Sequence, residues 1–147
     1  MLRRSLLLLS FWMLPVYFSL HLHTPAIGNS KEDMLSQSAL TLKNVYAALV
    51  FNKVEHPDIV LRQIIVETMW LRCDYCSKEM NNLFGFYLHG NYIKFDNWYE
   101  SVKYYKNWQK QYYKGGDYYQ FLNNIGYATS ENYTRTLRGV ILPEFAS

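Results

Sequence analysis

The pattern of apolar and polar positions predicts a mainly helical chain. Apolar side chains recur on one broad face over residues 31–52, and again, more densely, from residue 57 to about residue 72. Pro57 and Asp58 suit the first turn of this second helix. We expect the helix to be central and buried, since it is dense in Ile, Val, Leu and Trp. Further helices are predicted over residues 97–113, 118–125 and 130–142, with Gly or Pro after each.

The segment between the second and third predicted helices has a different character. Residues 73–82 are polar and show no clear period. In residues 83–95, aromatic-rich arms flank the turn sequence His89-Gly90-Asn91, which is typical of a small β-hairpin. The predicted fold class is therefore mainly α with a small β element.

The N-terminal residues 1–26 have the composition of an export signal. A short basic start, Met1-Leu2-Arg3-Arg4, precedes an apolar run over residues 5–20 and then small and polar residues. A retained membrane anchor and a buried N-terminal helix are the alternatives, but 16 residues fall short of the roughly 20 that span a bilayer. We expect residues 27–147 to form one domain in the periplasm, or secreted to the cell envelope.

Composition and charge restrict the class of protein. The chain has 147 residues, half of them apolar and 18% charged, which excludes a disordered or fibrous protein. Without Arg3 and Arg4, 13 basic residues face 12 acidic ones, so a nucleic-acid partner has little support. The 14 tyrosines suggest a surface that stacks against rings.

Two cysteines, Cys73 and Cys76, are spaced C-x-x-C. A zinc site needs about four ligands, and no His lies at ligand spacing. A redox motif would sit in a βαβ unit, and none is predicted. We therefore expect structural thiols or a local disulfide, and no metal or cofactor.

Glu67 is an acidic residue among apolar helical neighbours. Ile64, Trp70 and Leu71 lie one turn away, together with the polar Gln63. A carboxyl group in apolar surroundings resists ionisation, so its pKa rises, as a general acid at neutral pH requires. The alternative, equally supported by these residues alone, is a partly exposed Glu at the helix edge that bonds to Gln63 or to the backbone.

Four motifs, in order along residues 35–142, resemble the glucosaminidase domain family, glycoside hydrolase family 73. The first is residues 56–68, which contain Glu67, and the second is Asn81-Asn82-Leu83-Phe84-Gly85-Phe86. The third runs from Tyr92-Ile93-Lys94-Phe95 to Trp98-Tyr99-Glu100-Ser101-Val102, and the fourth is Ile125-Gly126-Tyr127-Ala128-Thr129 with Tyr133.

The resemblance implies a lysozyme-like helical fold whose small β-lobe borders a glycan cleft. It implies an endo-β-N-acetylglucosaminidase that hydrolyses the β-1,4 bond in peptidoglycan, with Glu67 as general acid. The expected partner is the peptidoglycan glycan strand. We expect no nucleic-acid partner, membrane contact only through an uncleaved N-terminal segment, and a monomer.

Several side chains are candidates for binding the sugar. An amide such as that of Asn82 can pair with an N-acetyl group, although a turn-forming role is the alternative. Gly85 lets the backbone approach a sugar closely, and aromatic faces suit sugar rings; for Trp98, core packing is the alternative. The predicted binding residues are Gln63, Asn82, Phe84, Gly85, Tyr92, Trp98 and Tyr133.

The chain departs from the family pattern at the second catalytic group. Met69 stands where many members carry Gly, Cys73 replaces a common Ser, and the hairpin has no acid between Phe84 and Phe95. Asp96 is the nearest candidate carboxylate, ahead of Glu100. Otherwise the substrate's own acetamido group acts as nucleophile with Tyr127 polarising it. An inactive binding module and a lytic transglycosylase are the alternative functions.

Overall fold

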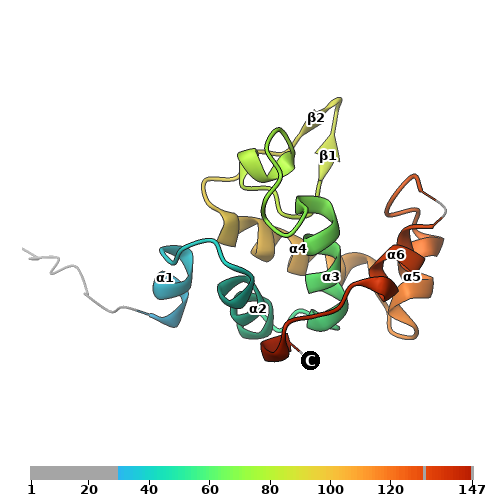
Figure 1. Ribbon diagram of the computed structural model, residues 1–147, viewed down its shortest axis with the longest axis horizontal. Coiled ribbons are helices and arrows are strands. Elements are labelled where there is room, and N and C mark those ends of the chain that lie inside the picture. Colours follow the sequence, from blue (N-terminus) through green and yellow to red (C-terminus); the bar gives the residue numbers. More distant parts are fainter. Residues whose placement is uncertain (1–29, 131, 147) are drawn as a thin grey trace, which may run out of the picture.

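The computed structural model describes residues 30–130 and 132–146, which form a helical body with one small β-hairpin (Figure 1). The mainly α, lysozyme-like fold with a hairpin lobe is confirmed. The predictions for residues 1–26 lie outside the described residues. In chain order the elements are α1 (Lys31–Ser36), α2 (Leu42–Phe51), α3 (Pro57–Thr68), η1 (Ser77–Met80), β1 (Tyr87–Leu88), β2 (Asn91–Tyr92), α4 (Trp98–Tyr112), α5 (Tyr118–Asn124), α6 (Tyr133–Gly139) and η2 (Glu144–Ala146).

Helix α3 lies at the centre of the helical body. It packs against α2 on one side and α6 on the other, and its apolar side chains are almost fully buried. Ile59, Val60, Leu61, Ile64 and Ile65 supply this core surface. The predicted central helix is therefore confirmed, and it carries the residues of the first family-like motif.

The prediction of one continuous helix over residues 31–52 is wrong. Two helices, α1 and α2, occupy this range with a break over residues 37–41. The Ser38 hydroxyl donates to the Leu35 carbonyl, and the Thr41 hydroxyl accepts from the Asn44 N–H. These short polar side chains satisfy backbone groups at the helix ends, which favours two caps over one continuous helix.

Helix α3 ends at Thr68, four residues before the predicted end. Met69, Trp70 and Leu71 follow with positive φ angles of 49°, 63° and 60°. The Thr68 hydroxyl donates to the Ile64 carbonyl at 2.6 Å and accepts from the Leu71 N–H at 3.1 Å. This left-handed run, which is costly for residues with a Cβ, turns the chain sharply away from the helix axis.

The last predicted helix, over residues 130–142, is also too long. Helix α6 ends at Gly139, and Val140 is extended. The Arg62 guanidinium on α3 donates to the carbonyls of Leu137 and Val140 and so holds the chain at this end of α6. A contact from a distant helix thus ends α6 before Pro143 does.

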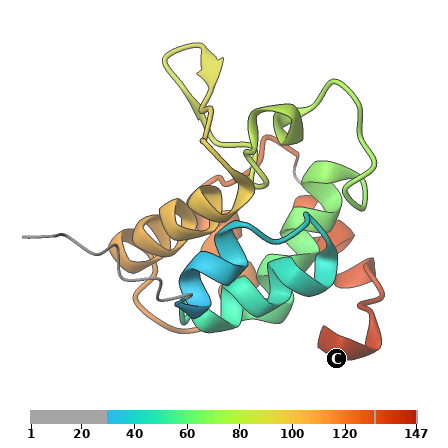
Figure 2. The same cartoon turned by 90° about the vertical axis from the view of Figure 1, so that its left-hand side faces the viewer.

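The predicted hairpin is confirmed. Strands β1 and β2 pair antiparallel, with Tyr87 opposite Tyr92 and Leu88 opposite Asn91. All four residues are exposed, and Figure 2 shows the hairpin projecting away from the helices. Within the described residues, the structure contains no helix that is both long and apolar enough to cross a membrane.

Candidate active site

Glu67 lies in the last turn of α3 and is half-buried. Its Oε1 accepts a hydrogen bond of 2.8 Å from the Tyr133 hydroxyl of α6. Burial raises the pKa of Glu67 above its ordinary value of 4.5, and the Tyr133 hydrogen bond offsets part of that rise. The protein thus favours the neutral carboxyl, which can donate a proton.

Glu67 opens into a cleft of about 590 Å³ between the hairpin lobe and the chain that leads into α6. Of the predicted site residues, the cleft brings Phe84, Gly85, Tyr92 and Tyr127 together with Glu67. The other lining residues, Tyr87, Ala128 and Thr129, are not among the predicted site residues. Two signals were available for them: Tyr87 is in the arm opposite Tyr92, and the other two follow Tyr127 directly.

Gly85 lies beside the second oxygen of the Glu67 carboxyl, Oε2. Its φ is +67°, and a Cβ placed on it would lie 3.0 Å from Oε2 of Glu67 and 3.7 Å from Cδ. Glycine is required here for two reasons, the left-handed backbone and the space that the carboxyl occupies. Oε1 therefore faces Tyr133, while Oε2 faces Gly85, which also lines the cleft.

Asn82 holds the base of the hairpin lobe. Its side chain donates to the carbonyls of Phe86 and Ile93, at 2.8 and 3.0 Å, and accepts from the N–H groups of Phe84 and Phe86. The residue is fully buried. Because these bonds use both ends of the amide, the structure argues against the predicted pairing with an N-acetyl group and assigns Asn82 to shaping the Gly85 loop.

Tyr127 stacks on Tyr133, with ring centroids 5.7 Å apart and planes at 24°. Its hydroxyl donates to the Phe84 carbonyl at 2.9 Å, and burial raises its pKa well above the ordinary value. The proton that would polarise a substrate acetamido group is therefore engaged by Phe84 in this structure. That role for Tyr127 stays a prediction and requires the bond to open.

Three further candidates lie away from the cleft lining. Trp98 is buried and its indole N–H donates to the Ser38 carbonyl, so the structure argues against the predicted sugar stacking and favours core packing. Gln63 is fully buried beneath Glu67, one turn earlier on α3. Asp96 is exposed at the hairpin exit and is not among the residues that line the Glu67 cleft.

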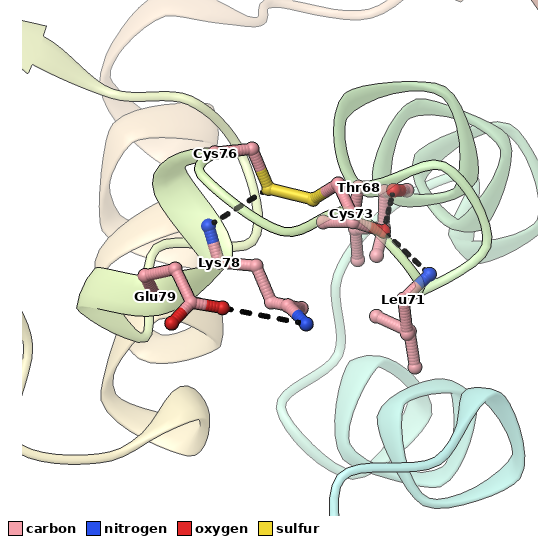
Figure 3. Close-up of a disulfide and its surroundings, with 7 residues drawn as sticks. Thr68, Leu71, Cys73, Cys76, Lys78 and Glu79 are labelled. Atoms are coloured by element: carbon pink, nitrogen blue, oxygen red, sulfur yellow. Dashed lines mark hydrogen bonds and ion pairs between the residues drawn. A yellow bond between two sulfur atoms is a disulfide. The ribbon is translucent and has the colours of Figure 1, made fainter.

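A disulfide joins Cys73 and Cys76 in the loop after α3 (Figure 3). This confirms the local disulfide, one of the two alternatives that the spacing left open. The Lys78 N–H donates to Sγ of Cys76 at the start of η1. The bond thus closes a short ring within the loop that connects the Glu67 helix to η1 and the Asn82 loop.

Within residues 30–130 and 132–146, no group of three or more His, Cys, Asp or Glu side chains could hold a metal ion. The expectation that the protein needs no metal or cofactor stays a prediction. The site combines a carboxyl whose pKa is raised with an open cleft lined by aromatic side chains. This arrangement suits proton transfer to a bound ring-shaped substrate.

Comparison with curated proteins gave no match, and comparison with solved structures gave none either. The family model described as mannosyl-glycoprotein endo-beta-N-acetylglucosaminidase matches residues 44–142, about two thirds of the chain. This range holds every predicted site residue and the whole Glu67 cleft. A match of this extent identifies the class of enzyme, a glycosidase with a peptidoglycan-related function. The chain belongs to the glucosaminidase family.

Proposed function

We propose that the domain is an exported peptidoglycan hydrolase that cleaves the β-1,4 bond of N-acetylglucosaminyl residues, with Glu67 as general acid. The observation that carries this proposal is the half-buried carboxyl at the wall of an open cleft. Burial raises its pKa, the direction that a general acid requires, and its Oε2 lies beside Gly85 of the cleft lining.

In the proposed step, Glu67 gives its proton to the glycosidic oxygen as the bond from that oxygen to the sugar C1 breaks. C1 is captured by water, or first by the substrate's own acetamido oxygen that water then displaces, so the products are two hydroxyl-ended sugars. The carboxylate that forms keeps the hydrogen bond from Tyr133 to Oε1. A hydrogen bond to an ionised group is stronger than one to a neutral group, so Tyr133 stabilises the charge that develops as the proton leaves.

The shape of the surface supports cleavage within a glycan strand. A second hollow of about 430 Å³ adjoins the Glu67 cleft, and the two share lining residues Phe84, Gly85, Tyr87 and Tyr127. A third hollow shares Ala128 and Thr129 with the cleft. Hollows that adjoin the Glu67 cleft leave room for more than one sugar of a strand.

The second catalytic group has two candidates. The first is Asp96, which does not line the Glu67 cleft and would have to lie within about 5–9.5 Å of Glu67 to form a carboxylate pair with it. The alternative is the substrate's own acetamido group, assisted by Tyr127. Asp96→Asn separates them: a loss similar to that of Glu67→Gln supports the carboxylate pair, and a small effect supports the acetamido route.

The decisive experiment is Glu67→Gln, which keeps the side-chain shape but removes the transferable proton. Turnover of purified cell walls should fall by at least about 10²-fold, while glycan pull-down by the folded variant persists. Turnover near that of wild type would refute the enzyme proposal.

Two alternatives make different predictions in the same assay. In an inactive binding module, the wild-type protein would bind glycan but would not hydrolyse it. The absence of a second carboxylate from the cleft lining favours this alternative. A lytic transglycosylase would release an anhydro sugar, which product mass distinguishes from the hydrolysed end. Export predicts a mature N-terminus near residue 27, measurable by sequencing the secreted protein; an intact Met1 start would contradict cleavage.

A further inference from the structure

The loop over residues 113–117, which joins α4 to α5, lines a hollow that the proposed proton step does not use (Figure 1). The hollow has a volume of about 430 Å³. It shares Tyr112 and Ile125 with the aromatic hollow that in turn adjoins the Glu67 cleft. A substrate that extends from the Glu67 cleft through the aromatic hollow therefore reaches this loop.

Two consecutive glycines, Gly115 and Gly116, give the hollow free backbone donors. Both line it, and their N–H groups donate to no acceptor within the described residues. Their φ angles are +98° and +96°, and neither has an atom within 4 Å of an added Cβ. Because no side chain covers this backbone, a ligand can approach its N–H groups closely.

Lys114 adds a positive charge to the same hollow. Its Nζ donates to the neutral carbonyl of Lys110 at 3.3 Å, and it forms no ion pair within residues 30–130 and 132–146. The acidic residue of the lining, Asp117, is engaged elsewhere: Oδ1 accepts from the Gln120 N–H at 2.9 Å, and Oδ2 lies 4.0 Å from the Arg138 guanidinium. An ammonium group beside free backbone N–H groups is a donor set that suits a carboxylate.

The loop is held in place from inside the protein. The buried Tyr113 hydroxyl donates to the Gly116 carbonyl at 2.6 Å, and Nε2 of His56 bonds to the same hydroxyl at 2.8 Å. The phenol has a single proton and a carbonyl can only accept, so His56 is the donor of the second bond. His56 directly precedes α3, so these bonds tie the loop to the start of the Glu67 helix. A loop fixed in this way loses little freedom when a ligand binds.

The charge of the hollow selects the part of the substrate that it fits. The sugars of a peptidoglycan strand present neutral hydroxyl and acetamido groups, whereas carboxylates lie in the peptide branches that some of the sugars carry. Complementary charge favours the partner that carries the opposite charge. A cation one hollow beyond the aromatic hollow therefore matches a peptide branch better than a further sugar.

We propose that this hollow binds a carboxylate of the peptide branch of peptidoglycan, with Lys114 and the N–H groups of Gly115 and Gly116 as donors. The branch belongs to a sugar seated in the neighbouring aromatic hollow. The site would make the domain prefer strands that still carry their peptides. The identity of the ligand rests on the proposed function, but binding of an acidic peptide can be measured without turnover.

The first test is a ¹⁵N NMR titration with the peptide alanyl-glutamyl-lysyl-alanine. The amide signals of Gly115 and Gly116 should shift, and Lys114→Gln should weaken binding about threefold, the scale of one exposed ion pair. The matched control, Lys110→Gln, changes an exposed lysine one turn earlier that does not line the hollow, and should bind as wild type does.

The ligand's own chemistry supplies the other comparisons in that titration. The same peptide with its carboxylates amidated should bind at least about tenfold more weakly, because it offers no charged acceptor. Unshifted glycine amides, or equal binding of the amidated peptide, would overturn the proposal. A neutral chitotetraose that shifts Gly115 and Gly116 as strongly would overturn it too, because a sugar would then occupy the hollow.

The second test compares hydrolysis of intact cell walls with that of strands whose peptides an amidase has removed. Wild type should have the higher kcat/KM on intact walls, and the ratio of the two values should fall about threefold in Lys114→Gln but not in Lys110→Gln. An equal ratio in wild type and Lys114→Gln would contradict the peptide site while leaving the hydrolase proposal intact. Peptide binding as expected in a wild type that hydrolyses neither substrate would support the site and refute the proposed function alone.

Discussion

Gly85→Ala is the sharpest test of the geometry at the carboxyl. The new Cβ would lie 3.0 Å from Oε2 of Glu67, whereas ordinary contacts begin at 3.4 Å, so the carboxyl must retreat by about 0.4 Å. A misplacement of about 1 Å can cost 10²-fold in rate, which places the expected loss of kcat near tenfold. The positive φ adds a separate cost in stability of about 1 kcal/mol.

Two other glycines separate these effects. Gly126 has a similar φ of +63° and Gly90 has +85°, and neither has an atom within 4 Å of an added Cβ. Gly126→Ala and Gly90→Ala should therefore lose stability as Gly85→Ala does, while only Gly85→Ala loses kcat. The measurements are thermal unfolding and the release of reducing sugar from cell walls. A kcat of Gly85→Ala within twofold of that of Gly126→Ala would refute the reasoning.

Three other outcomes are expected. The double variant Cys73→Ser, Cys76→Ser should lose about 2 kcal/mol of unfolding free energy, the loop-entropy value for a four-residue ring, and keep its turnover; a stable but inactive variant would contradict this. Burial raises the pKa of folded Glu67 above 4.5, so the stability due to its neutral form is complete below pH 4.5 and is lost as pH rises through the folded pKa. Glu67→Gln has no carboxyl to ionise, so its unfolding free energy should rise relative to that of wild type as the pH goes from acid to neutral. Denaturant unfolding at several pH values measures this difference, and a difference that is constant with pH would contradict the raised pKa. EDTA should leave activity intact, and loss restored by zinc or calcium would contradict the metal-free mechanism.

The direction of the Glu67 pKa was predictable from sequence, but only part of its cause was. The helical pattern placed Ile64, Trp70 and Leu71 beside the carboxyl. Helix α3 ends at Thr68, however, and Trp70 is 43% exposed, so it does not cover Glu67 as a helical neighbour would. Much of the surrounding structure comes from Tyr133, 66 positions away, and from the Gly85 loop. Helical periodicity predicts a face, but not the distant segment that packs on it.

The hydrogen-bond partners of the polar residues near the site could not be predicted from the sequence. Asn82 was selected because an amide can pair with an N-acetyl group, and Tyr133 because its ring suits a sugar. The structure engages both inside the protein, in hydrogen bonds to the hairpin and to Glu67. A side-chain type defines how many bonds a group can make. The partner depends on tertiary contacts that one sequence does not display.

The tyrosines have two roles, and composition alone suggested only the first, which is to present exposed rings to a sugar. Tyr87 and Tyr92 are exposed at the cleft, as expected for sugar-facing rings. Tyr105 and Tyr118, by contrast, are buried and hydrogen-bonded to one another.

Phenylalanine would fill the same volume in the core, but it would leave the amides of Gln63 and Gln109 with unpaired polar atoms, at a cost of about 1–3 kcal/mol for each buried group. Conversely, a buried phenol without these amides would lack a partner of its own. The hydrogen bonds between Gln63 and Tyr105, Tyr105 and Tyr118, and Tyr118 and Gln109 therefore allow these four polar side chains to be buried together in an apolar core. One end of this group is held by the Glu55 backbone, and the other end is Gln63, one turn before Glu67 on α3, so these hydrogen bonds fix the buried side of the helix that carries the acid.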